Sequence, residues 1–374
     1  MLKFEILKRD GLARVGVMHT PHGDIKTPAF VGAATRATVK ALTFAEMNEL
    51  GSQAVLANTY HLFLAPGGEL IREGGGLAEF TGWHKPTFTD SGGFQIFSLP
   101  NVKISEEGAE FKSHIDGRKF LMTPESSMQT QWQIGADIHM AFDQLAKSES
   151  REDMQRAMAQ THRWLTRCVA EHERLEKEYL TQGLPEQYLF AVVQGGTFLD
   201  LRRESAEFEG ELEVDGYGIG GVFTADGMDE MLKTVCPILP ETRPRHLLGM
   251  GQEPRDLFIG AEFGCDTFDC VGPTRMARNG SLYTLDGRVN IKNAKFKHDF
   301  TPVMADCGCE CCKNYTRAYL HHLFKVDEIT AKVLASIHNE YFVVTVVDKI
   351  RDSLLDGSFQ EYKKEFLSRY YGNL

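Results

Sequence analysis

Eight short apolar runs that end in Gly, Asp or Asn recur along the first 275 residues of this chain. They lie at residues 27–32, 53–59, 85–93, 135–143, 188–196, 216–222, 245–251 and 265–273. Most segments between them show helical spacing, most clearly 149–179, where Met154, Met158 and Leu165 follow a cap signal at Ser150. Parallel strands need crossover connections and cover on both sheet faces. The alternation therefore predicts an α/β fold, a (β/α)8 TIM-type barrel with outer helices, and an open doubly wound sheet is the alternative.

Two antiparallel segments and a C-terminal region fall outside this alternation. Residues 1–26 indicate strands that turn at Asp10-Gly11 and His22-Gly23, and 101–123 indicates a hairpin-like insertion around Asp116-Gly117. After the last run the chain becomes basic, then rich in cysteine, then helical, with an apolar stripe over 326–355 that we expect to pack as core. We therefore predict a barrel domain at 1–274 and a smaller helical subdomain, inserted or appended, at 275–374.

The composition indicates a well-cored globular protein, because 42% of the residues are hydrophobic and 25% are charged. No apolar run approaches the length of about 18 residues that a membrane helix needs. The N-terminal segment alternates charged and apolar residues where a signal peptide would carry an apolar block. We expect a cytoplasmic protein.

Three carboxylates stand at the ends of predicted strands: Asp90 in FTDSGGF, Asp143 in MAFDQ and Asp269 in TFDCVGPTR. In a barrel, all of these strand ends face one mouth. Burying an unpaired carboxylate costs several kcal/mol or shifts its pKa. A helix N-cap would explain any one of them, but three together favour a chemical role. Two carboxylates around a bond to an anomeric carbon are typical of glycosyl transfer, with one as nucleophile and one as general acid/base.

Glycines lie beside the same strand ends, at 92–93, 195–196, 220–221 and 249. Without a Cβ atom, these positions let a flat ligand approach backbone N–H and C=O groups. Asp143 and Gln194 suit a guanine-like edge, because a carboxylate accepts from N–H and NH₂ groups while Gln donates to a carbonyl oxygen. Tight turns would explain the glycines alone equally well. Together with Asp143 and Gln194, they indicate a pocket for a base.

Four of the eight cysteines fall within residues 307–312. Cys307, Cys309 and Cys312, with the distant His338, supply three thiolates and one imidazole, the ligand set of a closed tetrahedral zinc site. Cys311 is then a spare, because adjacent cysteines do not easily bind one ion. An iron–sulfur cluster that uses all four cysteines is the competing interpretation. No coordination position stays open, so we predict one structural Zn²⁺ per chain.

The chain is acidic overall, with 41 Lys and Arg against 52 Asp and Glu, a net charge of −11. This balance argues against non-specific coating of nucleic acid but not against a local basic patch. The stretch 275–300 holds six basic and two acidic residues, a local charge of +4. A solvated charged face is the usual explanation. Because the stretch directly follows Asp269, we favour a surface that delivers a phosphate backbone to the barrel mouth.

Four motifs together resemble the tRNA-guanine transglycosylase family, of the bacterial queuine tRNA-ribosyltransferase type. They are TDSGGFQ at 89–95, FDCVGPTRMARNG at 268–280, the Cys-x-Cys-x-x-Cys with its distant His, and TRAYLHHL at 316–323. The resemblance spans nearly the whole chain. It implies a barrel with a zinc-binding subdomain, a homodimer, and exchange of the wobble guanine of tRNA for a 7-deazaguanine base.

The resemblance also implies residue roles. Asp269 would be the nucleophile on the ribose, and Asp90 the general acid/base. The base pocket would be formed by Ser91, Phe94, Asp143, Gln194, Gly220, Gly221 and Gly249. Zinc would be bound by Cys307, Cys309, Cys312 and His338. The basic charge of 275–300, and not the resemblance, predicts that the tRNA contacts Arg275, Arg278, Lys292, Lys295 and Lys297. A non-catalytic tRNA-binding partner subunit of the same fold is the alternative, and intact Asp90 and Asp269 argue against it.

Two segments depart from the family pattern near the base pocket. The family usually continues from the Asp143 position as Asp-Glu-Cys-Thr-Pro-Tyr-Pro, where this chain has DQLAKSE, and Gly-Gly-Leu-Ala-Val-Gly-Glu appears as GGVFTAD at 220–226. Leu145, Thr224 and Asp226 thus replace groups associated with a small aminomethyl substituent. The sequence leaves open which base enters, and we expect queuine to be accepted at least as well as its aminomethyl precursor.

Overall fold

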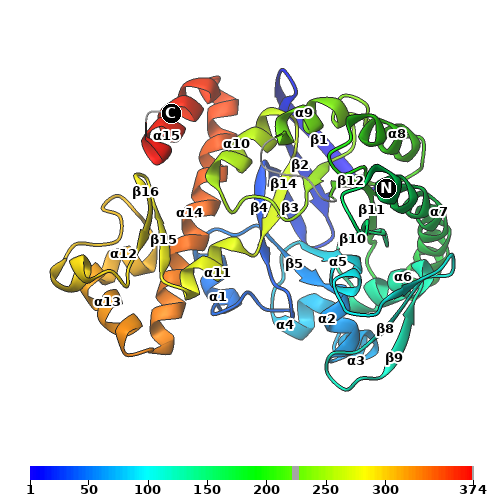
Figure 1. Ribbon diagram of the computed structural model, residues 1–374, viewed down its shortest axis with the longest axis horizontal. Helices are drawn as coiled ribbons and strands as arrows, with labels where there is room; N and C mark the ends of the chain where they lie inside the picture. The colour runs from blue at the N-terminus through cyan, green and yellow to red at the C-terminus, as the bar shows by residue number, and fades with distance from the viewer. Residues whose placement is uncertain (221–226, 373–374) are drawn as a thin grey trace.

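The computed structural model describes residues 1–220 and 227–372. Eight parallel strands close into a barrel in the order β10-β11-β12-β13-β14-β4-β5-β6 (Figure 1). The strands are β4 Ala29–Ala33, β5 Ala54–Asn58, β6 Thr87–Asp90, β10 Ile138–Met140, β11 Tyr188–Val193, β12 Gly216–Ile219, β13 Arg245–Leu247 and β14 Thr267–Cys270. Seven of them lie within the predicted runs, and β4 extends one residue beyond its run, 27–32. The closed (β/α)8 barrel is confirmed, and the open sheet is excluded because β14 pairs with β4 in parallel.

The barrel interior is filled by large apolar side chains. Val31, Leu56, Phe88 and Phe190 belong to one buried cluster inside it. Strands buried on both faces explain why the runs are continuously apolar instead of alternating. The packed interior leaves the C-terminal ends of the strands as the place for a site.

A three-stranded antiparallel sheet covers the N-terminal end of the barrel. It consists of β1 Lys3–Asp10, β2 Ala13–Thr20 and β3 Gly23–Thr27. The Leu2 backbone N–H donates to Asp215 (2.7 Å), and His22 Nδ1 lies 2.8 Å from Asp137 Oδ1. Both aspartates directly precede barrel strands, so this sheet closes the barrel at the end opposite the mouth, and the predicted antiparallel strands are confirmed.

Ten helices in the described residues before Cys265 surround the barrel or line its mouth. They are α1 Phe44–Glu49, α2 Thr59–Leu64, α3 Gly68–Glu73, α4 Gly76–Thr81, α5 Gly93–Phe97, α6 Pro124–Ile134, α7 Arg151–Thr181, α8 Leu199–Gly210, α9 Met228–Val235 and α10 Pro254–Glu262. Helix α7 begins after Ser150, whose side chain accepts from the Asp153 N–H (3.2 Å), as its cap signal predicts. No helix in the described ranges is long and apolar enough to cross a bilayer.

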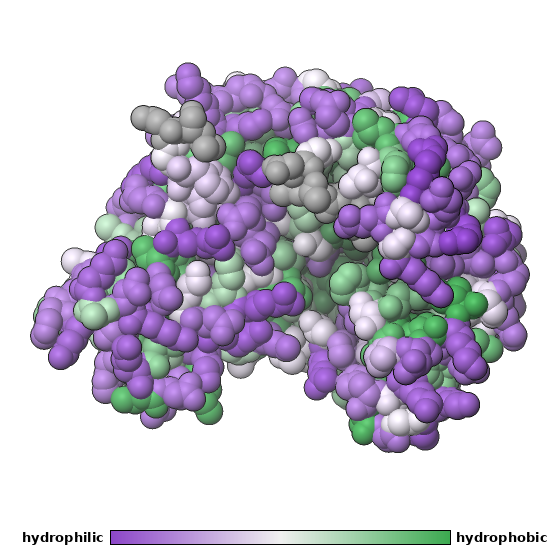
Figure 2. Space-filling model, in the orientation of Figure 1, coloured by the Kyte–Doolittle hydropathy of each residue, from purple (hydrophilic) through white to green (hydrophobic). Residues whose placement is uncertain are grey.

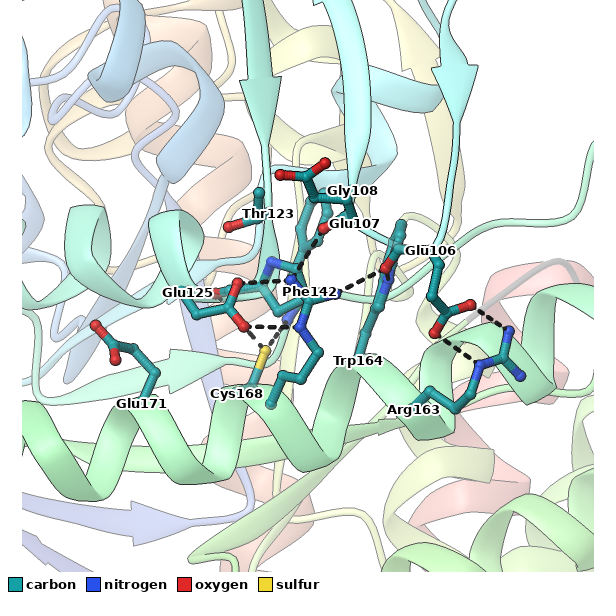
Figure 3. Close-up of polar contacts among 12 residues, drawn as sticks. Glu106, Glu107, Gly108, Thr123, Glu125, Phe142, Arg163, Trp164, Cys168 and Glu171 are labelled. Atoms are coloured by element: carbon teal, nitrogen blue, oxygen red, sulfur yellow. Dashed lines mark hydrogen bonds and ion pairs between the residues drawn. The ribbon is translucent and has the colours of Figure 1, made fainter.

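The insertion at 101–123 forms a small antiparallel sheet of β7 Lys103–Ile104, β8 Ala109–Lys112 and β9 Lys119–Met122. The predicted hairpin is β8–β9, and β7 extends it. Figure 3 shows how α7 holds this sheet: Arg163 forms an ion pair with Glu106, and Trp164 Nε1 donates to the Glu106 carbonyl oxygen (2.9 Å). The insertion is therefore fixed to the same helix that supports the end of β10.

The C-terminal region extends to one side of the barrel (Figure 1). It comprises α11 Gly272–Arg278, β15 Ser281–Thr284, β16 Gly287–Asn290, a 3₁₀ turn η1 Ala294–His298, α12 Glu310–Asn314, α13 Arg317–Lys325, α14 Ile329–Asp356 and α15 Phe359–Tyr371. Helix α14 contacts strand β4 of the barrel as well as α11, α12 and α13. A subdomain boundary at residue 274 remains a prediction, since α14 packs against both parts.

The apolar stripe of 326–355 forms core from Leu334 onward, with Phe342 and Ile350 buried. The first two residues of the predicted stripe are exposed and do not form core. Val326 follows the end of α13 and is 54% exposed, and Ile329 at the start of α14 is 75% exposed. The stripe pattern breaks there because the chain reverses between the two helices.

Candidate active site

The barrel brings the predicted polar residues to one mouth. Asp90 is the last residue of β6, Gln194 directly follows β11, and Asp269 lies near the end of β14. Asp143 follows β10 by three residues. Figure 2 shows the face in this view hollowed near its centre, over the barrel. Residues separated by up to 179 positions in sequence therefore share one site because parallel strands end at the same edge.

Asp90 is held by three donors. Its carboxylate accepts from Asn58 Nδ2 (2.6 Å) and from the backbone N–H groups of Thr59 (3.1 Å) and Gly92 (3.0 Å). Burial raises the pKa of Asp90 to about 7 despite these bonds, and the negative charge of Asp269 adds to the increase. Such a group exchanges a proton near neutral pH, as a general acid/base requires.

Asp269 accepts two hydrogen bonds on the same oxygen. The Gly249 N–H donates to Oδ1 at 2.8 Å, and His246 Nε2 donates to Oδ1 at 3.1 Å. Gly249 has φ +72°, a conformation that favours glycine and that turns its N–H toward the carboxylate.

His246 is a site residue that the sequence analysis missed. It lies within β13, is fully buried, and its Nδ1 is 2.8 Å from Thr267 Oγ1. In the run RHLLGMG it reads as an ordinary strand residue. As the second residue of the predicted run 245–251, it carried no local signal that pointed to the mouth.

Asp143, Gln194 and Ser91 form a connected group. Gln194 Nε2 donates to Asp143 Oδ2 (2.6 Å), and Ser91 Oγ donates to Asp143 Oδ1 (2.9 Å). Burial raises the pKa of Asp143 to about 6, while these two bonds act in the opposite direction. A Cβ atom at Gly93 would lie 2.9 Å from the Asp143 carbonyl oxygen, so only glycine fits beside this group.

Helix α7 fixes the backbone on both sides of Asp143. The Phe142 N–H donates to Cys168 Sγ (3.4 Å), and the Gln144 N–H donates to Thr161 Oγ1 (2.9 Å). Figure 3 shows Cys168 on α7 near Phe142 and Glu125, with Trp164 between it and the Arg163–Glu106 ion pair. These two hydrogen bonds to α7 therefore fix the position of the Asp143 backbone and, with it, of the carboxylate.

The remaining predicted pocket residues differ in placement. Gly220 directly follows β12 and is buried, and the Phe94 ring at the start of α5 is 66% exposed. Gly221 lies outside the described residues, as do Thr224 and Asp226. The binding roles of these residues remain predictions.

The cysteine cluster forms a buried site suited to a metal ion. The ligand atoms of Cys307, Cys309, Cys312 and His338 lie within 4.8 Å of one another. His338 Nε2 donates to the Tyr283 carbonyl oxygen (2.7 Å), so Nδ1 presents its lone pair to the three sulfur atoms at 3.8, 3.6 and 3.3 Å. These distances fit the ligand edges of roughly 3.6 Å that follow from tetrahedral Zn–S and Zn–N bonds. Cys311 is buried but is not one of these four ligands.

The predicted basic residues lie on the surface of the C-terminal region. Arg275, Lys292, Lys295 and Lys297 are exposed, and Arg278 is half-buried. Phe300, 73% exposed, adds an aromatic ring to this stretch. Contact of these residues with tRNA remains a prediction.

Two carboxylates, Asp90 and Asp269, at the mouth of a (β/α)8 barrel define an enzyme site suited to glycosyl transfer. A sequence model of the family described as queuine tRNA-ribosyltransferase, or TGT, matches residues 10–372. The chain belongs to this family of pentosyltransferases.

Individual relatives are similar along almost their whole length. A queuine tRNA-ribosyltransferase of Symbiobacterium thermophilum is 45% identical over 99% of this chain and 92% of the relative. One of Caldanaerobacter subterraneus is 44% identical over 100% of this chain and 98% of the relative. One of Herpetosiphon aurantiacus is 46% identical over 96% of this chain and 91% of the relative.

Proposed function

We propose that this protein exchanges the wobble guanine of tRNA anticodons for a 7-deazaguanine base by double displacement. The observation that carries the proposal is the presence at one barrel mouth of Asp269, whose Oδ1 accepts two hydrogen bonds, and Asp90, whose pKa burial raises to about 7. One carboxylate is poised as a nucleophile and the other as a proton carrier. Membership of the family supports this assignment.

In the first half of the reaction, Asp269 Oδ2 attacks the anomeric carbon of a flipped-out guanosine. The glycosidic bond breaks, its electron pair stays with guanine, and protonated Asp90 gives its proton to the leaving base. A covalent ribosyl-Asp269 ester remains. In the second half, Asp90 accepts the proton of the incoming base, which attacks the same carbon and displaces Asp269. Two inversions produce net retention.

The base would lie between the Asp143 group and the glycines at the ends of β12 and β13. Asp143 accepts from the N–H and NH₂ groups of a guanine edge, while Gln194 and backbone N–H groups donate to its carbonyl oxygen. Ser91 and Gln194 already orient Asp143 through both carboxylate oxygens. The exposed ring of Phe94 offers a face on which a base can stack.

The C-terminal region would bind the tRNA backbone through Arg275, Arg278, Lys292, Lys295 and Lys297. Cys307, Cys309, Cys312 and His338 would hold one zinc ion, whose contribution is structural because all four positions are filled by protein. We also propose a homodimer, which the exposed apolar residues Val326 and Ile329 between α13 and α14 support. Sedimentation of the purified protein at several concentrations tests this assembly.

The decisive experiment mixes the purified protein with tRNA and labelled guanine. Incorporation of label by this protein alone supports the proposal. No incorporation alone, but incorporation after a second subunit is added, would instead establish the non-catalytic partner subunit. Competition of queuine and 7-aminomethyl-7-deazaguanine against labelled guanine then identifies the base. We expect queuine to compete at least as well, and a tenfold preference for the aminomethyl base would reject that expectation.

A further inference from the structure

Helix α8 places one buried arginine behind the ends of two neighbouring barrel strands. Arg202 is fully buried. Its Nε donates to the Gly196 carbonyl oxygen at 2.9 Å, and its Nη1 donates to the carbonyl oxygens of Val193 (2.8 Å) and Gly220 (2.6 Å). One guanidinium thus joins the end of β11 to the end of β12.

The joined carbonyls flank the proposed base pocket. Val193 directly precedes Gln194, whose amide orients Asp143, and Gly220 directly follows β12 on the other side. A guanidinium is planar and donates in a fixed fork, so its bonds set the spacing of the carbonyls that it contacts. The separation of the two strand ends at this point therefore depends on Arg202.

The same helix makes a second contact with this loop. Ser205 Oγ accepts from the Gln194 N–H (3.0 Å) and donates to Glu209 Oε1 (3.0 Å), and Glu209 is fully buried. Gly195 has φ +123°, and a Cβ atom there would lie 2.6 Å from the Arg202 backbone N. Glycine at this position lets the loop lie directly on the first turns of α8.

Burying a guanidinium removes a charge from water, which is costly unless hydrogen bonds compensate. Burial lowers the pKa of Arg202 to about 9, the direction expected for a cation removed from water. Arg245 provides a contrast inside the same barrel. It is also buried and donates to the carbonyls of Gly264 and Leu239, but it lies at the N-terminal start of β13, away from the mouth.

We infer that Arg202 is a positioning residue for base binding, which sets the width of the pocket between Gln194 and Gly220. This inference rests on the proposed function, because it assumes that a guanine or 7-deazaguanine base binds between these strand ends. We expect Arg202 to act through the three carbonyl oxygens to which it donates, those of Gly196, Val193 and Gly220.

Arg202→Lys tests the assignment, because lysine keeps the charge but loses the planar fork. We expect KM for guanine to rise tenfold or more, kcat at saturating guanine to stay within about threefold, and the dissociation constant for tRNA to stay within twofold. Arg202→Gln is the second variant. Arg245→Lys is the matched control, and it should lower the melting temperature without changing KM for guanine.

A folded Arg202→Lys protein with an unchanged KM for guanine overturns the inference. So does loss of folding in both Arg202 variants while Arg245→Lys folds, since Arg202 would then serve folding alone. Wild-type protein is measured in parallel. If it neither incorporates guanine nor forms a covalent adduct with tRNA, the proposed function itself fails, whatever the Arg202 variants do.

Discussion

His246 Nε2 lies 3.1 Å from Asp269 Oδ1, inside a barrel where His246 has no access to solvent. On its other side, His246 Nδ1 lies 2.8 Å from Thr267 Oγ1. When the Thr267 hydroxyl donates to Nδ1, the ring proton sits on Nε2 and points at the carboxylate. The histidine therefore fixes Oδ1 of Asp269 and orients the carboxylate.

His246→Phe should slow formation of the covalent RNA adduct by about tenfold to a hundredfold, since a hydrogen bond to a charged group contributes about 1.5–3 kcal/mol. Affinity for tRNA should not change. His246→Gln, which keeps a donor, should recover part of the rate. His139→Phe is the control, because His139 is equally buried but is bonded to Thr89 and Gln187. Equal rates of adduct formation for His246→Phe and wild type would show that His246 does not orient Asp269 for attack.

Asp269→Asn should abolish both base exchange and the covalent adduct, with activity falling about a thousandfold or more, while tRNA still binds. The amide has the same shape but cannot act as the nucleophile. Denaturing gels of protein mixed with tRNA would show the loss. A shifted protein–RNA band that persists in this variant would transfer the role to Asp90 or Asp143.

The rate of guanine release should fall as pH rises through about 7, because release needs protonated Asp90 and burial raises the pKa of this group to about 7. Asn58→Ser removes the 2.6 Å bond that favours the charged carboxylate while keeping a residue type that can cap α2. The pKa should then rise further, by about half to one unit. The pH profile of kcat/KM for tRNA measures this shift, and a move to lower pH would contradict the assignment.

Cys309→Ala should release the bound metal, loosen the C-terminal region and weaken tRNA binding before it affects the base pocket, since structural metal binding contributes to folding. Metal analysis should find about one zinc per wild-type chain. Cys311→Ala is a matched control, because Cys311 is buried next to the site but is not one of the four ligands. Iron with a visible charge-transfer absorption would reject the zinc assignment.

Charge reversal of Lys292, Lys295 and Lys297 together should weaken tRNA binding and reduce its salt dependence, because each lost phosphate contact removes close to one unit of the salt slope. Exchange at saturating tRNA should change less. Reversal of three exposed lysines far from the mouth, Lys3, Lys26 and Lys177, serves as the control. Equal binding by both triple variants at low and moderate salt would leave the basic stretch as a solvated face.

The sequence alone determined the barrel, because local patterns carry that information. Strands buried on both faces appear as continuous apolar runs. In the crossover helices, apolar residues recur at every third or fourth position. Glycine and aspartate mark the strand ends. The cluster of Cys307, Cys309, Cys312 and His338, which could hold a metal ion, was also predictable, since its three cysteines lie within six residues of one another. Asp90, Asp143 and Asp269 were predicted from a different local pattern, because each carboxylate follows or ends an apolar run.

Only the tertiary structure decided how these residues are held. His246 and Arg202 carry no local signal, because their partners, Asp269 and the Gly220 carbonyl, lie 23 and 18 positions away and meet them only when parallel strands align. The raised pKa of Asp90 likewise depends on burial that the closed barrel creates. Sequence patterns record which faces are buried, whereas the directions of hydrogen bonds between neighbouring strand ends depend on the closed barrel itself.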